Sequence, residues 1–166
     1  MAAIKGLCSR FLIDMNAIAF RPLFVLEVET KPQIVGDVPM GYFRRTGMIV
    51  SGRFYGPKLQ GKLLPGGGDW LIKRKDGVIH LDVRAVLETD DGHGIYMTYT
   101  GRLKGSPAID ARMAKGETIA AEELYFRTLV QFEAAAESLL WMNDIVAVGV
   151  GSRRPNGPVY SIYEIL

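Results

Sequence analysis

The residues with the best spacing for chemistry lie on two consecutive strand-like runs. Asp82 and Arg84 are two positions apart on the first run, and Tyr99 follows on the second run, after the turn Asp91-Gly92. Residues two apart on a strand share a face, so the carboxylate of Asp82 and the guanidinium of Arg84 lie side by side. Facing a cavity, Asp82 accepts a proton while Arg84 or Tyr99 stabilises an oxyanion. Facing solvent, Asp82 and Arg84 form an ordinary exposed ion pair.

The register of this hairpin bears on the choice between the two interpretations. A two-residue turn at Asp91-Gly92 places Arg84 opposite Tyr99, with Asp82 nearby, which makes a cluster of the three side chains. A three-residue turn places Asp82 opposite Arg102, an ordinary cross-strand ion pair. The alternation of residue types alone favours the exposed pair. That interpretation leaves the interior to the apolar residues of the first run, Leu81, Val83, Ala85 and Leu87.

A glycine triplet stands before this hairpin, in Gly66-Gly67-Gly68-Asp69-Trp70. Glycine permits positive φ and close backbone approach. The segment lacks the Lys-Ser/Thr ending and the following helix of a phosphate-binding loop. In the plainer interpretation it is a wide turn, with Trp70 as a core or rim aromatic. In the functional interpretation Asp69 and Trp70 stand at a cavity mouth, and Trp70 is a wall for a ligand.

Three further residues are candidates for substrate binding. Arg127 lies on a strand-like run, where an arginine is usually exposed, but inside a barrel it must pair with an anion. Asn143 either caps a turn or donates a hydrogen bond to a ligand carbonyl. Trp141, two residues earlier, would then pack on the ligand ring.

Residue types that bind metals are scarce in this chain. His80 and His93 lie on different segments, and no third histidine joins them. The single cysteine, Cys8, forms neither an internal disulfide nor a cysteine-rich metal site. We therefore expect no metal and no organic cofactor, and a reducing cytoplasm as the location. No serine has the setting of a nucleophile elbow.

The elements that must position these residues are short strands between turns. Nineteen glycines and eight prolines punctuate apolar runs, which favours an all-β protein. The predicted strands are Leu23–Thr30, Gly41–Val50, Lys58–Leu64, Asp69–Lys73, Val78–Glu88, Gly94–Lys104, Leu124–Phe132, Ile145–Gly151 and Val159–Leu166. One short helix is predicted over Ala108–Lys115, with Ser106 as its cap. A closed antiparallel barrel removes the exposed sheet edges, and a β-sandwich is the competing architecture.

Length and charge narrow the classes of protein. A chain of 166 residues is one domain, and we expect residues 21–166 to form it, with residues 1–20 as an arm, a lid or an extra strand. A net charge of +2 gives no reason to expect nucleic acid. No apolar run reaches membrane-spanning length. The apolar segment Phe11–Phe20 needs cover, which predicts a homo-oligomer, most simply a dimer.

The motifs GGGDW, LDVR, TDDG, YFRT and LLWMN follow one another in this order. Together they resemble the bacterial and fungal domain-of-unknown-function 3237 family, from about Leu23 to the C-terminus. The resemblance implies a closed eight-stranded barrel similar to allene oxide cyclase. It also favours an interior position for Asp82 and Arg84, since the LDVR motif passes through both.

From these residues we hypothesise a small-molecule enzyme that needs no cofactor, of the isomerase, cyclase or lyase type. It would act on an apolar or aromatic carbonyl compound inside the barrel, with Asp82 as the base. The alternatives are a lipocalin-like protein that binds a hydrophobic metabolite without chemistry, and a structural barrel with no ligand. A polar cavity with a perturbed carboxylate favours the enzyme, and an apolar cavity favours the binding protein.

Overall fold

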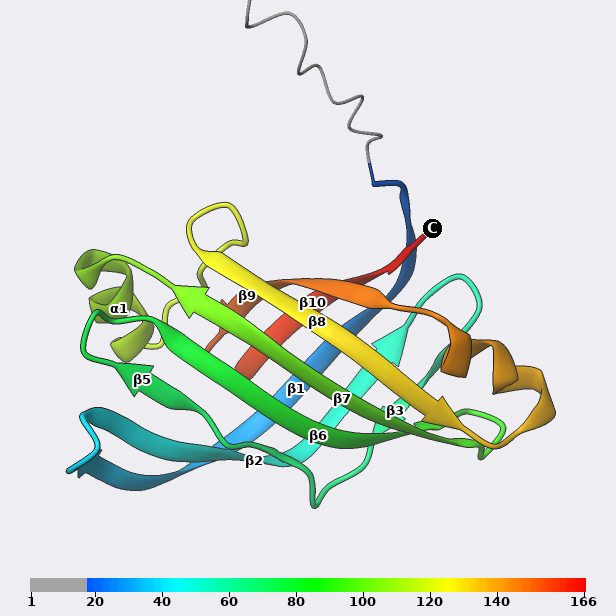
Figure 1. Ribbon diagram of the computed structural model, residues 1–166, viewed down its shortest axis with the longest axis horizontal. Coiled ribbons are helices and arrows are strands. Elements are labelled where there is room, and N and C mark those ends of the chain that lie inside the picture. Colours follow the sequence, from blue (N-terminus) through cyan, green and yellow to red (C-terminus); the bar gives the residue numbers. More distant parts are fainter. Residues whose placement is uncertain (1–17) are drawn as a thin grey trace, which may run out of the picture.

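The computed structural model describes residues 18–166, whose strands form one antiparallel sheet (Figure 1). The strands are β1 (Phe20–Val38), β2 (Tyr42–Tyr55), β3 (Gln60–Leu63), β4 (Gly68–Asp69), β5 (Ile72–Arg74), β6 (Ile79–Thr89), β7 (Gly94–Lys104), β8 (Tyr125–Ala134), β9 (Ala147–Arg154) and β10 (Gly157–Ile165). The predicted ranges match most of these strands, but β1 is much longer than predicted.

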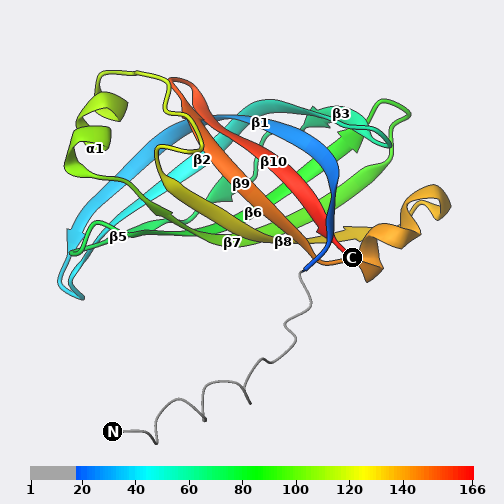
Figure 2. The same ribbon diagram turned by 90° about the horizontal axis from the view of Figure 1, so that it is seen from above.

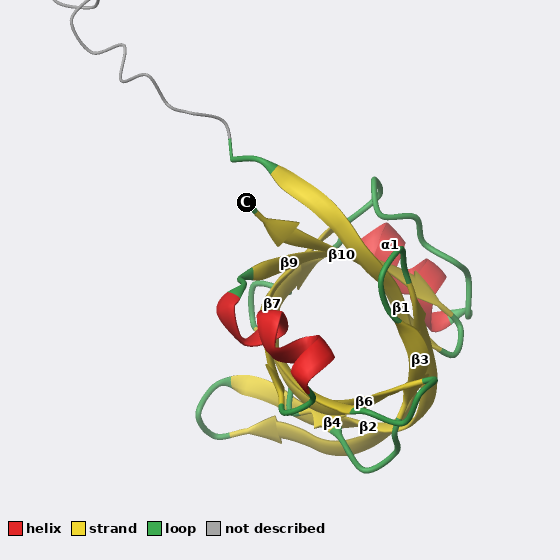
Figure 3. Cartoon of the chain, turned by 90° about the vertical axis from the view of Figure 1, so that its right-hand side faces the viewer, coloured by secondary structure: helices red, strands yellow, loops and turns green. Residues whose placement is uncertain are grey.

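The sheet closes on itself. Eight strands follow one another in the order β1-β10-β9-β8-β7-β6-β3-β2, and β1 pairs with β2 to complete the ring, which Figure 3 shows end-on. The short strands β4 and β5 lie in the same seam as β3, between β2 and β6. This closed ring confirms the predicted all-β, eight-stranded antiparallel barrel, and it excludes the β-sandwich.

Each long strand alternates between an inner and an outer face. On β8, Phe126, Val130 and Phe132 are buried, while the intervening Arg127 and Leu129 are exposed. Side chains point to opposite faces at successive strand positions, so this alternation fixes which residues line the interior.

Two helices lie at opposite ends of the barrel (Figure 2). The helix α1 (Pro107–Ala114) begins after Ser106, whose side chain accepts a hydrogen bond from the backbone N–H of Ile109. This is the predicted helix. The 3-10 helix η1 (Glu137–Asp144) was not predicted, and it buries Leu139 and Met142. Across the described residues, neither helix is long and apolar enough to span a bilayer.

The interior has two parts of different character. Towards η1 it is packed, with Phe24 in edge-to-face contact with Phe54 and Phe132 at ring-centroid distances of 5.4 and 5.9 Å. Towards α1 it is hollow. The predicted arm at residues 1–20 lies almost wholly outside the described residues, as does most of the segment Phe11–Phe20.

Candidate active site

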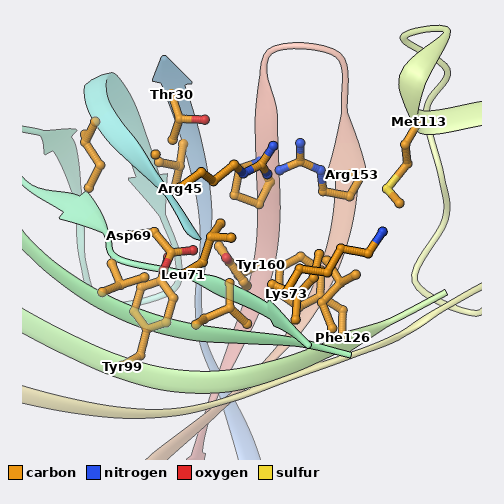
Figure 4. Close-up of a pocket in the computed structure, with 18 of the residues that line it drawn as sticks. Thr30, Arg45, Asp69, Leu71, Lys73, Tyr99, Met113, Phe126, Arg153 and Tyr160 are labelled. Atoms are coloured by element: carbon orange, nitrogen blue, oxygen red, sulfur yellow. The ribbon is translucent and has the colours of Figure 1, made fainter. Parts of the chain in front are cut away.

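The hollow part of the barrel is a cavity of about 540 Å³ that extends to α1 (Figure 4). Its apolar walls include Val28, Ile49, Leu71, Leu81, Val83 and Leu103. Its polar and charged lining includes Arg45, Asp69, Lys73, Tyr99, Asp110, Arg153 and Tyr160. Charged groups gathered in an otherwise apolar cavity are typical of a site for a small ligand.

The glycine triplet places Asp69 in this cavity. Gly66 has a φ of +101°, so the chain turns there in a conformation that favours glycine. Gly67 packs so close to β6 that a Cβ atom on it would lie 2.4 Å from the carbonyl oxygen of Arg84. The chain can therefore enter the seam between β2 and β6 as the two-residue strand β4, and Asp69 lines the cavity.

The carboxyl of Asp69 is poorly solvated. Its Oδ1 accepts a hydrogen bond of 3.0 Å from the backbone N–H of Asp82. Burial raises the pKa of Asp69 to about 6, while that hydrogen bond and the nearby guanidinium of Arg45 oppose the rise. A carboxyl with a pKa near neutrality can both accept and donate a proton at ordinary pH.

Two tyrosines form the floor of the cavity, beside Asp69. The rings of Tyr99 and Tyr160 meet edge to face at 5.3 Å, and Phe126 meets Tyr160 at 5.1 Å. Burial raises the pKa of both tyrosine hydroxyls, so both remain protonated near neutral pH. Protonated hydroxyls in a poorly solvated site are hydrogen-bond donors for a developing oxyanion.

Two arginines complete the polar wall. Arg45 projects from β2 and Arg153 from β9, and Figure 4 shows their guanidinium groups directed toward one another. Near α1, the amine of Lys73 lies 2.9 Å from a carboxylate oxygen of Asp110, in a salt bridge that joins β5 to the helix. The cavity thus has one raised-pKa carboxyl, two hydroxyl donors and two guanidinium groups.

The prediction that Asp82 and Arg84 face the barrel interior is wrong. They form a salt bridge of 2.9 Å on the outer surface, and each side chain is 50% exposed. Their neighbours Leu81, Val83 and Ala85 are buried instead. The alternation of residue types had favoured this exposed pair, and the LDVR motif had favoured the interior.

The physical reason is the hairpin register. The turn is Asp90–Gly92, closed by a hydrogen bond of 2.9 Å from the backbone N–H of Thr89 to the carbonyl of His93. Tyr99 is therefore opposite Val83, not Arg84, and Asp82 is opposite Thr100. A slip of one residue moves a whole strand's side chains to the other face. Tyr99 lines the cavity, as predicted, but without Asp82 and Arg84.

Two aromatic–arginine pairs also lie on the outer face. Trp70 is 36% exposed, and the guanidinium of Arg84 lies 5.5 Å from the centroid of its ring, so it is no wall of the cavity. Arg127 donates a hydrogen bond to the carbonyl of Phe126 and stacks on Tyr125. Trp70 and Asp69 face opposite sides because they are consecutive residues of one extended segment.

Trp141 and Asn143 belong to η1, at the far end of the barrel from the cavity. The side-chain amide of Asn143 bonds the backbone N–H and the carbonyl of Ala134, at 3.0 and 2.9 Å. The indole N–H of Trp141 donates to the carbonyl of Ser138 at 3.1 Å. These contacts match the plainer interpretation of Asn143, a cap for the turn.

Arg45, Arg153 and Tyr160 were not predicted as site residues. Arg153 lies next to Arg154 at the end of β9. Adjacent residues of a strand point to opposite faces, so one member of the pair Arg153-Arg154 had to point inward. Arg154 is the outer one, and it donates to Glu27 at 3.0 Å. The described residues contain no cluster of three or more His, Cys, Asp or Glu side chains suited to a metal ion.

Known proteins resemble this chain in sequence and in structure over most of its length. A UPF0311 protein of Clostridium acetobutylicum is 34% identical over 136 residues, which cover 81% of this chain and 85% of that protein. The crystal structure of a conserved protein of unknown function from Rhodopseudomonas palustris has a TM-score of 0.84 at 25% identity, covering 90% of this chain and 99% of that one. A β-barrel-like protein of Acinetobacter baumannii has a TM-score of 0.77 at 31% identity, covering 90% and 97%.

A more distant structure has the same fold. It is described as an enzyme from Penicillium herquei, with a TM-score of 0.67 at 19% identity, covering 90% of this chain and 95% of that one. The model of the family described as "Protein of unknown function (DUF3237)" matches residues 18–165. With this match over almost the whole barrel, the chain belongs to the DUF3237 family.

Proposed function

We propose that the barrel is an enzyme that moves protons on a small apolar or aromatic carbonyl compound, with Asp69 as the acid–base group. Isomerisation, cyclisation and elimination of such compounds can each begin with removal of a proton from the carbon next to the carbonyl. The observation that carries the proposal is Asp69 itself. Its buried carboxyl, with a pKa raised to about 6, faces a cavity with two tyrosine hydroxyls and two guanidinium groups.

In the proposed step, the ionised Asp69 removes a proton from the carbon next to the substrate carbonyl. The electron pair of the broken C–H bond forms a C=C bond, and the carbonyl becomes an enolate oxygen. The hydroxyl of Tyr99 or Tyr160 donates a hydrogen bond to that oxygen. Asp69 then returns its proton to the opposite face of the same carbon or, in a conjugated enolate, to the far carbon of the conjugated system. The carboxylate of Asp69 is thereby restored and an isomer is released.

A cavity that only stores a hydrophobic metabolite has no use for this arrangement. Burying a carboxyl next to arginines is costly unless the groups interact with one another or with a ligand. Carriers of apolar compounds need apolar walls, whereas this cavity combines such walls with the buried, raised-pKa carboxyl of Asp69. That carboxyl therefore favours the enzyme over the lipocalin-like binding protein.

The experiment is exchange of α-hydrogens in D2O, followed by proton NMR, with 2-tetralone and phenylacetone as probes. We expect the protein to accelerate the exchange, and Asp69→Asn to slow it by about a hundredfold or more. The rate should rise with pH and level off above the pKa of about 6. Asp82→Asn is the matched control, because it makes the same change on the outer surface.

An exchange rate in Asp69→Asn equal to that of Asp82→Asn would contradict the proposal. So would the absence of any acceleration with either probe. Tyr99→Phe refines the assignment, since it removes one hydroxyl and leaves the aromatic floor in place. We expect it to slow exchange without shifting the midpoint of the pH profile.

A further inference from the structure

Arg45 and Arg153 differ from the other arginines of the described residues. Nine arginines donate a side-chain hydrogen bond to a carboxylate or a backbone carbonyl: Arg21, Arg44, Arg53, Arg74, Arg84, Arg102, Arg112, Arg127 and Arg154. Within residues 18–166, Arg45 and Arg153 have no such side-chain hydrogen bond and no salt bridge. These two arginines line the cavity.

The charges around this pair do not balance. A guanidinium stays charged at any ordinary pH, and two that face one another repel. Burial lowers the pKa of Arg153, and Arg45 lowers it further. Lys73 and Asp110 neutralise one another at the mouth. The remaining carboxylate is Asp69, so the group carries one excess positive charge, and two when Asp69 is protonated.

We propose that Arg45 and Arg153 form an anion subsite that binds the carboxylate of a small apolar or aromatic acid. A planar guanidinium matches the two oxygens of a carboxylate, and two facing guanidinium groups can hold one carboxylate between them. A single negative charge balances the excess, and the apolar walls fit the body of the ligand. This inference rests on the proposed function, and it gives the substrate of that site an acidic group.

The test compares two probes of nearly equal shape, 2-naphthoate and 2-naphthamide, by isothermal titration calorimetry. We expect the protein to bind the anion about tenfold more tightly than the amide, or better. Arg45→Met and Arg153→Met should each remove about tenfold of the affinity for naphthoate and leave naphthamide unchanged. Arg127→Met, on the outer face of β8, is the matched control.

Three results would overturn the subsite. They are equal affinities of the unchanged protein for the two probes, no naphthoate binding at millimolar concentration, and arginine variants that behave like Arg127→Met. Binding of naphthamide reports that each variant still folds around an intact cavity. Arg45→Lys and Arg153→Lys keep the charge and lose the planar fork, so they should recover only part of the naphthoate affinity.

The pH dependence of naphthoate affinity tests the anion subsite separately from the proposed function, and it depends on the groups that face Asp69. Asp69 is faced by Arg45 on β2, Tyr99 on β7, Arg153 on β9 and Tyr160 on β10, and the backbone N–H of Asp82 on β6 donates to it. Lys73 on β5 and Asp110 on α1 line the same cavity.

Protonation of Asp69 removes a negative charge near the subsite. Naphthoate affinity should therefore rise as the pH falls from about 8 to about 5, while the probe stays ionised. Asp69→Asn should bind naphthoate more tightly at neutral pH and lose this pH dependence. If the arginine variants lose naphthoate affinity but Asp69→Asn still exchanges α-hydrogens, the subsite stands and the proposed base is wrong. The reverse pattern leaves the base and removes the subsite.

Discussion

Asp69 links the chemistry of the cavity to the stability of the fold. Its pKa is about 6 in the folded protein, against an ordinary value of 3.8 in the unfolded chain. Between these two pH values the folded protein holds a proton that the unfolded chain has already released. Stability must therefore fall as the pH rises through this window, because ionisation of Asp69 opposes folding. The buried carboxyl of Asp69 is therefore a cost to the fold near neutral pH.

We predict that Asp69→Asn removes this cost. The free energy of unfolding of the variant, minus that of the unchanged protein, should increase by about 2.5 kcal/mol between pH 4 and pH 7. Urea unfolding at a series of pH values measures this difference. Taking the difference cancels groups such as Glu27, whose pKa is lowered to about 2 by Arg53 and which acts in the opposite direction.

The control for this pH series is Asp82→Asn. Its exposed carboxylate is in a surface salt bridge, and such pairs contribute less than about 1 kcal/mol. Its difference curve should therefore be nearly flat. A flat curve for Asp69→Asn as well would mean that Asp69 is as well solvated as a surface carboxylate.

Single residues also show where sequence reasoning reaches its limit. The chain has two arginine pairs, Arg44-Arg45 and Arg153-Arg154, and strand geometry sends one member of each pair inward. Which member points inward depends on which alternate positions of the strand face the interior. Two adjacent charged residues break the apolar–polar alternation from which those positions would be recognised. Arg44 bonds the carbonyl of Trp70 outside, so Arg45 is the inner residue. Asp69 and Tyr99 could be named from sequence, but Arg45, Arg153 and Tyr160 could not.

At the scale of elements, the glycine triplet determines where the carboxyl lies. Gly67 has a backbone conformation open to any residue, but a Cβ atom there would collide with the backbone of β6. At Gly66 the reverse holds. Its φ of +101° is strained for any other residue, but a Cβ atom added there would have no atom within 4 Å. A substitution at Gly67 therefore tests close packing against β6, whereas a substitution at Gly66 tests backbone strain.

We predict that Gly67→Ala is more damaging than Gly66→Ala. Gly66→Ala should cost about 1–2 kcal/mol, the price of one strained residue. Gly67→Ala should cost more than that and should also displace Asp69, because the added methyl forces β4 away from β6. Urea unfolding measures the first effect, and the pH midpoint of α-hydrogen exchange reports the second. Equal effects of both substitutions on that midpoint would contradict this account.

Strand positions were predictable because turns and alternation mark them, whereas the register was not. The turn Asp90–Gly92 has three residues, and its exact pairing depends on the hydrogen bonds between Thr89 and His93. Sequence alone offered two pairings, and neither has Tyr99 opposite Val83. The helix η1 was missed for a related reason, since Leu139 and Met142 gain their apolar cover only from the assembled barrel.

At the scale of the whole molecule, the barrel has a packed half and a hollow half. The boundary is the aromatic floor of Tyr99, Phe126 and Tyr160. The strand β7 runs through both halves. Its residues Leu103 and Tyr99 line the cavity, whereas Met97 and Ile95 belong to the packed core. The packed half stabilises the ring, so the other half can remain open for a ligand.

We predict that Phe126→Ala costs about 3–5 kcal/mol, because it opens a void in the floor next to an existing cavity. Tyr125→Ala is the control on the same strand. Its side chain is 58% exposed, so it should change stability by less than about 1 kcal/mol. Thermal or urea unfolding distinguishes the two. A similar small effect for both would show that the floor does not support the fold.

The oligomeric state is a further prediction at this scale. The hairpin of β1 and β2 exposes Ile34, Val35 and Met40, each more than two-thirds exposed. Exposed apolar groups of this kind favour association, and a two-fold dimer is the commonest closed form. We expect light scattering to give about twice the chain mass of 18.3 kDa. A mass of one chain at micromolar concentration would contradict this.

The seam between β2 and β6 has a consequence for how this site can change. Seven strands of the ring are continuous, but this seam is filled in turn by β3, β4 and β5, of four, two and three residues. Such short pairings open more readily than long ones, so their amide hydrogens should exchange first. Asp69 and Lys73 belong to this interrupted part. Replacing the segment from residue 64 to 78 would therefore exchange the acid of the site while keeping the rest of the ring, which makes the seam a natural place to evolve or engineer new chemistry.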